Sequence, residues 1–377
     1  MSVPAIVSGL AGGEREVDAE RRRRREACRV RGSVRVAVVG GGVAGLSAAC
    51  DLRALGAKVV IIEDRDVRET PSWVAAGLIE PVAGTQDRAG MQRELAAFER
   101  SMQVWRAVAA SGSPLISRRR VLTVCATSRP PLPWADAVEG FRPVARGEVP
   151  ARYVDGDAAS FSTYVVETSR WLMATRARLA RDGVRFVRAR VETLDQVTER
   201  VGPVDGIVNA SGLGAARLAQ DPTLFRGDGH IVRVRPTAGV HDVFMDETRA
   251  PEDVAADPYA VNMLYIIPRR HDIVIGGTLW DSPNVDGVPQ RLPGMGEHLR
   301  ALAAEVEPRL ARAPILEYLV GARPRRRAGV RVELQADGAV PVAHLYGQGG
   351  SGWTLAPGLA EQAVGLLADA TWARRVA

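Results

Sequence analysis

The stretch that decides the fold is Val34-Arg35-Val36-Ala37-Val38-Val39-Gly40-Gly41-Gly42-Val43-Ala44-Gly45. Its first six residues form a short run rich in β-branched side chains, which is typical of a strand buried on both faces. The glycines follow at once. The apolar, alanine-rich residues 46–55 then predict a helix, which Gly56 ends. A strand, a glycine turn and a helix in this order are typical of a unit that binds the diphosphate of a dinucleotide.

The glycines of the turn have different expected roles. Gly40 permits the tight bend, Gly42 lets a diphosphate approach the backbone, and Gly45 lets the helix pack closely on the strand. The free N–H groups at the helix start attract phosphate. We therefore predict that the turn contributes these cofactor-binding residues: Gly40, Gly41, Gly42, Val43, Ala44 and Gly45. A purely structural glycine turn is the alternative, because glycine is common in this chain.

An acidic residue stands where the second strand is expected to end. Residues 59–62 predict another buried strand, and Glu63 follows it directly. A carboxylate at this point accepts hydrogen bonds from the ribose hydroxyls of a bound dinucleotide. Asp64 and Arg65 are close competitors for that role. NAD and FAD both bind to such a unit, so these residues by themselves indicate only a dinucleotide.

Length and composition set wider limits. A chain of 377 residues with 46% hydrophobic side chains can bury a large core in two or three domains. We find no apolar run of the roughly 18–20 residues that a membrane crossing needs, and no secretory signal. We therefore expect no membrane association and a cytoplasmic location. Cys28, Cys50 and Cys125 lie far apart and the five histidines are scattered, so we expect neither a disulfide framework nor a metal site.

The basic charge does not indicate nucleic-acid binding. The sequence pI is about 9.7, but Lys58 is the single lysine and five arginines stand together at 21–25. No aromatic side chains alternate with them for stacking on bases. We expect residues 1–33, which contain the run, to be a charged and disordered extension.

The remaining pattern alternates helices and strands. Helices are expected at 95–108, 169–181, 296–306 and from about 357 to 370, and a proline-rich loop at 128–133. Strands are expected at 121–124, 184–187, 205–212, 230–234, 264–267, 273–275 and 342–346, of which those from 230 to 275 should be antiparallel.

Several of these segments resemble, in order, the D-amino-acid oxidase family of FAD flavoproteins. The similar segments are Val74-Ala75-Ala76-Gly77-Leu78, Val208-Asn209-Ala210-Ser211-Gly212, Leu264-Tyr265-Ile266-Ile267-Pro268 with Gly276-Gly277-Thr278, Gly321-Ala322-Arg323-Pro324, and Leu345-Tyr346-Gly347-Gln348-Gly349-Gly350-Ser351-Gly352-Trp353-Thr354. The resemblance covers roughly residues 34–370. It implies FAD rather than NAD.

The resemblance also implies site residues. Arg323 and Tyr265 would hold a substrate carboxylate, and the carbonyl of Gly350 would accept from the substrate amine. From the residues alone, Arg323 also fits a surface ion pair and Tyr265 a core tyrosine. Further cofactor-binding residues implied by the resemblance are Ser72, Ala76, Gly77, Val191, Ser211, Gly349, Gly350, Ser351, Gly352, Trp353 and Thr354.

Four positions depart from the family pattern. Val261 and Ala322 stand where eukaryotic members have tyrosine and phenylalanine, and Ser351 stands near an aromatic position. We expect a wider pocket, or one shaped for an unusual amine. Glu80 replaces a glutamine and would favour a basic or polar substrate.

We therefore expect a Rossmann-like α/β domain that binds FAD, interleaved with an antiparallel-sheet α+β domain that binds substrate. Residues 34–85, 156–215 and 316–372 would form the first domain, and 86–155 and 216–315 the second. The expected activity is hydride transfer from Cα of a D-amino acid to flavin N5, with O2 reduced to H2O2. Oxidation of glycine, a secondary amine or a natural-product amine is one alternative. A flavin-binding protein without turnover is another alternative. The protein could also form a homodimer.

Overall fold

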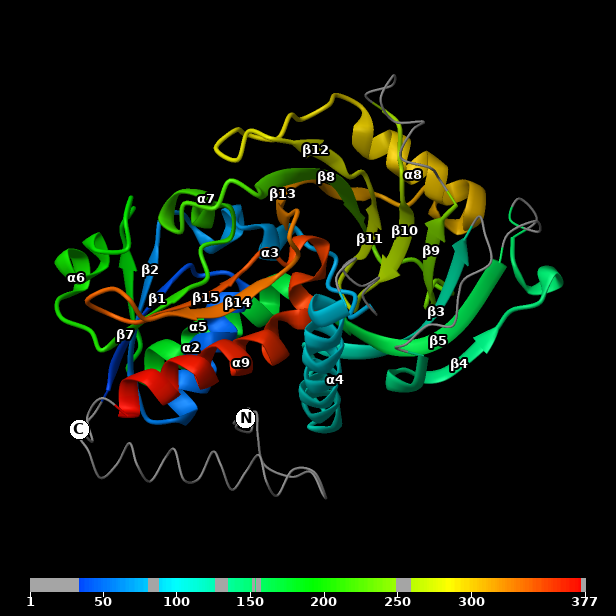
Figure 1. The fold of residues 1–377 in the computed structure, drawn as a ribbon. Helices are drawn as coiled ribbons and strands as arrows, with labels where there is room; N and C mark the ends of the chain where they lie inside the picture. The colour runs from blue at the N-terminus through cyan, green and yellow to red at the C-terminus, as the bar shows by residue number, and fades with distance from the viewer. Residues whose placement is uncertain are drawn as a thin grey trace.

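A computed structural model describes residues 34–80, 88–125, 135–150, 153, 157–248 and 259–373. Within these residues the chain forms two sheets that lie side by side (Figure 1), one of six strands and one of nine. The predicted extension at 1–33 and the predicted loop at 128–133 lie outside the described residues. None of the described helices combines the length and the apolar character that a membrane crossing requires.

The six-stranded sheet contains the predicted dinucleotide unit. Its order is β14-β15-β7-β1-β2-β6, in which only β14 and β15 pair antiparallel. The central strand β1 is buried because strands flank it on both edges and apolar side chains pack on both of its faces. The strands are β1 (Arg35–Val39), β2 (Lys58–Glu63), β6 (Arg185–Arg188), β7 (Gly206–Asn209), β14 (Arg331–Gln335) and β15 (Val342–Tyr346).

Helices α2 (Val43–Ala54), α5 (Thr168–Arg181) and α9 (Gly352–Ala373) cover one face of this sheet (Figure 1). Helix α4 (Arg88–Ala110) lies between the two sheets, against α9 and β3. The shorter helices are α3 (Pro71–Val74), α6 (Gln196–Val201) and α7 (Ala215–Leu218). The predicted order of strand, glycine turn, helix and strand is confirmed.

The nine-stranded sheet follows the order β12-β8-β11-β10-β9-β3-β5-β4, and β13 also pairs with β8. All its pairs are antiparallel except β3 with β9. The strands are β3 (Ile116–Cys125), β4 (Glu139–Pro143), β5 (Asp157–Val166), β8 (Leu224–Val234), β9 (Val243–Glu247), β10 (Leu264–Pro268), β11 (Ile273–Gly276), β12 (Trp280–Ser282) and β13 (Ile315–Arg326).

The two faces of this sheet have different neighbours. Phe244, Leu264 and Ile266 belong to the core that packs against helix α8 (Met295–Val306). Alternate residues point the other way, because side chains on a strand change face with each residue. Met245 and Tyr265 are therefore on the opposite face, and they lie side by side in the β9–β10 register. That face looks toward the six-stranded sheet.

Sheet membership differs in part from the expected domains. Strands β5 and β13 pair within the nine-stranded sheet, although they fall in segments that we expected in the FAD domain. The division into two domains stays a prediction.

The last helix begins earlier than predicted. It starts at Gly352 rather than near residue 357, so Pro357 lies inside it. Proline has no N–H to give to the carbonyl four residues before it, which is that of Trp353. The indole Nε1 of Trp105 donates to this carbonyl instead, at 3.3 Å. A residue on α4 thus supplies the hydrogen bond that proline removes, and a local sequence pattern does not reveal it.

Trp105→Phe tests this contact. Trp105, Trp171 and Trp353 pack on one another with ring centroids 5.2–6.1 Å apart. Both Trp105→Phe and the control Trp171→Phe reduce this packing, but only the first removes the bond to the Trp353 carbonyl. We expect urea unfolding to show that Trp105→Phe lowers the free energy of unfolding by about 1 kcal/mol more than Trp171→Phe does. Equal losses in the two variants would contradict the role of the hydrogen bond.

Candidate functional site

A cavity of about 1610 Å³ lies between the two sheets. One wall is the carboxyl edge of the six-stranded sheet, where Val39, Glu63 and Ala210 end or follow parallel strands. Ligands of α/β sheets bind at this edge. The other wall is the inner face of the nine-stranded sheet, with Met245 and Tyr265. Typical small-molecule pockets measure roughly 300–1,000 Å³, so this cavity has room for a large cofactor together with a substrate.

All but one of the predicted site residues line this cavity. The exception is Gly45, for which a Cβ atom would lie less than 3.0 Å from the carbonyl oxygen of Gly40. Its place fits the predicted packing role. Gly40 has φ +114°, and a Cβ atom there would also lie less than 3.0 Å from the carbonyl oxygen of Ala210. The turn thus brings the start of α2 against the ends of β1 and β7.

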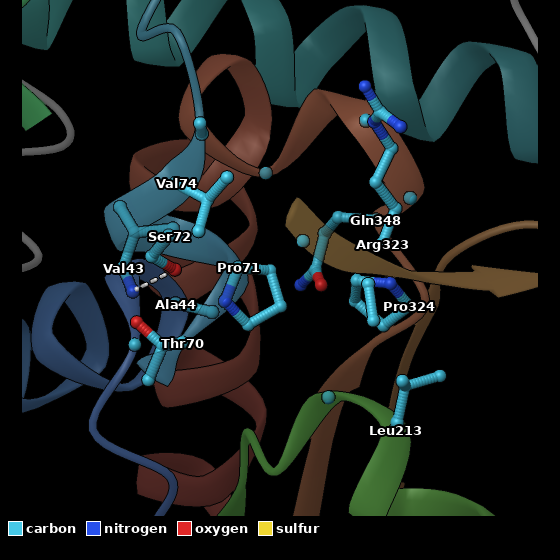
Figure 2. Close-up of a pocket in the computed structure, with 18 of the residues that line it drawn as sticks. Val43, Ala44, Thr70, Pro71, Ser72, Val74, Leu213, Arg323, Pro324 and Gln348 are labelled. Atoms are coloured by element: carbon cyan, nitrogen blue, oxygen red, sulfur yellow. Dashed lines mark hydrogen bonds between the residues drawn. The ribbon is translucent and has the colours of Figure 1, made fainter. Parts of the chain in front are cut away.

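Ser72 meets the start of α2. Its Oγ accepts a hydrogen bond from the backbone N–H of Val43 at 3.0 Å (Figure 2). A Cβ at Gly42 would lie 3.0 Å from the same oxygen. The Nε1 of Trp353 donates to the backbone carbonyl of Ser72 at 3.1 Å. The predicted residues of the turn, of α3 and of the start of α9 are therefore connected, although about 280 residues separate the last two.

Glu63 is held by a residue that the sequence analysis missed. Arg176 on α5 binds both carboxylate oxygens, at 2.6 and 2.9 Å, and its guanidinium lies 4.3 Å from the ring centre of Phe186. A carboxylate has about four acceptor positions, so this pair leaves room for ribose hydroxyls. Asp64 and Arg65 pair with each other and are much more exposed than Glu63. Glu63 is thus the most firmly positioned of the three candidates.

Gln348 also escaped the sequence analysis. The residue is 8% exposed and lines the cavity, and its Nε2 has no hydrogen-bond partner among the described residues. Figure 2 shows the carboxamide between Pro71 and Pro324. A buried donor without an acceptor costs about 1–3 kcal/mol. A ligand oxygen would remove that cost, so the residue fits a cavity that holds an oxygen-rich cofactor.

The predicted catalytic residues meet at the other end of the cavity. The Nη1 of Arg323 donates to the carbonyl of Thr278 at 3.0 Å, and a Cβ at Gly350 would lie 3.8 Å from Cδ of Arg323. Burial raises the pKa of the Tyr265 hydroxyl, and the guanidinium of Arg323 beside it opposes part of that rise. Arg323, Tyr265 and Gly350 therefore lie together.

Thr278 is fixed in turn by His230, another residue without a predicted role. The Thr278 hydroxyl bonds the backbone N–H of His230 at 3.0 Å and its Nδ1 at 2.8 Å. Both residues are almost fully buried, and burial lowers the pKa of His230. The imidazole of His230 therefore supports the residue whose backbone carbonyl accepts from Arg323.

The departures from the family pattern are divided between cavity and core. Glu80, Ala322 and Ser351 line the cavity. Val261 does not: it is 4% exposed and packs in the core beside α8. Among the described residues, Val261 does not border the cavity, so its small side chain adds no space there. The expected widening of the pocket at this position was wrong.

A turn that binds dinucleotides, joined to a cavity large enough for cofactor and substrate, defines a nucleotide-dependent oxidoreductase. The model of a family described as FAD dependent oxidoreductase (DAO) matches residues 35–366. The chain belongs to this family, and FAD is its cofactor. The predicted resemblance and fold class are confirmed.

Individual relatives agree with this assignment. A D-amino-acid oxidase from Rubrobacter xylanophilus is 34% identical over 343 residues, which cover 90% of this chain and 98% of the relative. A D-aspartate oxidase from Homo sapiens is 29% identical over 362 residues, covering 91% and 97% respectively. Among solved structures, glycine oxidase from Geobacillus kaustophilus matches with a TM-score of 0.70 at 18% identity, covering 89% of this chain and 95% of that one.

Gln348→Leu tests whether the unpaired amide serves the cofactor. Leucine keeps the size and removes the donor, so we expect FAD to bind roughly 2- to 12-fold more weakly, from 0.5–1.5 kcal/mol per hydrogen bond. The protein without cofactor should melt at the same or a higher temperature, because an unsatisfied buried group is gone. Flavin fluorescence titration and thermal melting give the two values. The exposed Gln103→Leu is the control, and unchanged FAD affinity in Gln348→Leu would contradict the role.

A buried histidine stands behind Ser211. His344 Nδ1 accepts from the amide of Asn209 at 3.3 Å, and its Nε2 bonds the Gln335 side chain at 3.0 Å. The Oδ1 of Asn209 accepts from the Ser211 hydroxyl at 2.6 Å. Burial, together with the charge of Arg331, lowers the pKa of His344 to about 4.

His344 should therefore make the fold sensitive to acid. Between pH 6.5 and pH 4 the unfolded chain binds a proton at this side chain and the folded chain does not, so stability falls as the pH falls. The free energy of unfolding should fall between pH 7 and pH 4, and we expect this fall to be roughly 2–3 kcal/mol smaller in His344→Gln than in wild type. Urea unfolding at both pH values measures it, with the exposed His241→Gln as control. An identical pH dependence in wild type and His344→Gln would refute the prediction.

Proposed function

We propose that this protein is an oxidase of D-amino acids. It would convert the Cα–N bond to an imine while O2 is reduced to H2O2, and water would hydrolyse the imino acid to a 2-oxo acid and ammonia. The meeting of Arg323, Tyr265 and Gly350 in one cavity with the dinucleotide turn carries the proposal. The name of the R. xylanophilus relative supports the substrate class.

FAD supplies the electron acceptor of this reaction when it is bound. The turn at 40–45 and Ser72 would hold its diphosphate, and Glu63 its ribose. The loop at 349–354 and the start of α9 would place N–H groups beside the flavin, where a helix N-terminus stabilises negative charge. Gln348 would add a donor that has no partner among the residues that the structure describes.

The chain's own part in the reaction is to orient the substrate. A guanidinium has five N–H donors, so the bond from Arg323 to Thr278 leaves others for a carboxylate. The hydroxyl of Tyr265 would donate to the same carboxylate. The carbonyl of Gly350 would accept from the α-amino group and so direct Cα toward the flavin. Holding both ends of a substrate in this way lowers the entropic part of the barrier.

A small or unusual amine is the second candidate. Ala322 and Ser351 leave space at the cavity wall where the family resemblance implies aromatic residues. Glycine oxidase shares the fold. Glu80 in the lining would disfavour an acidic side chain and favour a basic or polar one.

The two domains, the cytoplasmic location and a homodimer remain further predictions. The antiparallel pairing of β5 and β13 within the nine-stranded sheet favours a substrate domain that includes these strands as well as segments 86–155 and 216–315.

Anaerobic reduction of the flavin separates the candidates. The holoenzyme is mixed with D-amino acids, L-amino acids, glycine and secondary amines, and loss of flavin absorbance is followed. We expect D-amino acids to bleach the flavin. Bleaching by glycine or secondary amines alone would favour the second candidate. A flavin that no amine reduces would favour a binding protein without turnover.

Arg323→Ala tests the carboxylate contact. Loss of a half-buried charged partner should cost roughly 2–4 kcal/mol of transition-state stabilisation, which is about a 30- to 1000-fold loss in kcat/KM. The neighbouring Arg327, which is exposed, gives the matched control Arg327→Ala. Steady-state oxidation of the best amino acid measures both. An unchanged kcat/KM in Arg323→Ala would remove this residue from the site.

A further inference from the structure

Two side chains of the proposed substrate site lie directly over glycines of neighbouring strands. A Cβ at Gly229 would lie less than 3.0 Å from Nη1, Cζ and Nη2 of Arg323. A Cβ at Gly276 would lie less than 3.0 Å from the phenol oxygen and two ring carbons of Tyr265. Real Cβ atoms do not come so close to other heavy atoms. Any other residue at either position would therefore displace the side chain that lies above it.

Strand pairing explains the arrangement. Strand β8 pairs with β13 on one edge and β11 on the other, and β11 pairs with β10. Gly229 stands opposite Gly321 of β13, and Gly276 stands opposite Tyr265 of β10. The two glycines lie on strands between those that carry Arg323 and Tyr265. Backbone without side chains therefore fills the space under both groups.

A left-handed backbone does not explain these glycines. Neither Gly229 nor Gly276 has a positive φ, in contrast to Gly40 of the dinucleotide turn. The left-handed region that favours glycine is therefore not the reason for glycine at either position. Glycine inside a strand also weakens it, because it packs no side chain and loses more entropy on folding. What glycine provides at these positions is the space above its Cα atom.

We infer that Gly229 and Gly276 are positioning residues of the substrate site: their bare backbone is the surface on which Arg323 and Tyr265 lie flat, so that both reach one carboxylate. The inference rests on the proposed function, in which Arg323 and Tyr265 bind that carboxylate. It assigns a role in substrate binding to two residues that touch no substrate themselves.

The contact at Gly229 is the more useful one to change. The atoms that a Cβ would meet are at the far end of a flexible side chain, so the guanidinium can move while the strand stays in place. Its bond to the Thr278 carbonyl, at 3.0 Å, would then be lost or rearranged. At Gly276 the obstacle is a rigid ring, and alanine there would disturb the strands themselves.

A double-mutant cycle tests the inference. Wild type, Gly229→Ala, Arg323→Ala and the double variant are prepared as holoenzymes, and the Kd of benzoate, a simple carboxylate, is measured from the flavin absorption spectrum. We expect Gly229→Ala to weaken benzoate binding at least about tenfold and to raise KM more than it lowers kcat. In the Arg323→Ala background the same change should have little further effect, because residues that act through one group are not additive.

Gly227→Ala is the matched control. Gly227 lies on the same strand two residues away, and a Cβ there would meet Arg325 and Leu279 at 2.7 and 2.9 Å rather than Arg323. We expect its benzoate Kd to stay within about twofold of wild type. Melting temperatures and flavin content of all variants show whether a change in affinity reflects general damage.

Each outcome decides the matter. Wild-type benzoate affinity in Gly229→Ala, or an equal loss in both backgrounds, would overturn the inference and leave the proposed function intact. Unchanged affinity in Arg323→Ala would overturn the proposed carboxylate contact and the inference with it. If Gly229→Ala does not fold, Arg323→Ala should restore folding, since it removes the atoms that clash. Failure of that restoration would also overturn the inference.

Discussion

The contact of backbone with backbone at the dinucleotide turn is the constraint on which the rest of the structure depends. Gly40 lies against the carbonyl of Ala210, and Gly45 lies against the carbonyl of Gly40. A Cβ at either position would push α2 away from β1 and β7. Because no side chain intervenes, the start of α2 stays at the carboxyl edge of the sheet, where Val43 and Ala44 line the cavity.

Glycines also shape the opposite wall of the cavity, but there they make room for side chains rather than for a helix. On the nine-stranded sheet, Gly229 and Gly276 leave space in which the large side chains of Arg323 and Tyr265 lie against the strands. At the dinucleotide turn, the missing side chains let helix α2 approach the sheet. At the proposed substrate site, they leave room for the guanidinium of Arg323 and the phenol of Tyr265. Sheet pairing fixes the distance between these groups, since neighbouring strands lie about 4.8 Å apart.

Residues outside the cavity hold the residues inside it. Arg176 fixes Glu63, Thr278 fixes Arg323, and Asn209 fixes Ser211. Each support comes from another strand, helix or turn, and burial makes its hydrogen bonds costly to break. The protein's own contacts therefore fix most of the cavity wall, and at Gln348 a donor without a partner among the described residues is left for a ligand.

The sequence by itself determined the strand, glycine turn and helix from residue 34 to residue 55, the acid at the end of β2, and the family with its FAD cofactor. Each of these features depends on residues that are close together in the sequence: apolar runs, turn glycines and motifs of fixed spacing. They can therefore be recognised without knowing which residues lie nearby in space. Only the tertiary structure placed β13 beside β8, set Pro357 inside α9, joined Arg176 to Glu63 and put Val261 in the core. Each of these depends on a partner far along the chain, and a contact of that kind has no fixed spacing in the sequence. Gln348 shows most clearly what the sequence could not reveal. The residue is visible in the sequence of the glycine loop, but the fold buries its amide, whose Nε2 then has no partner among the described residues.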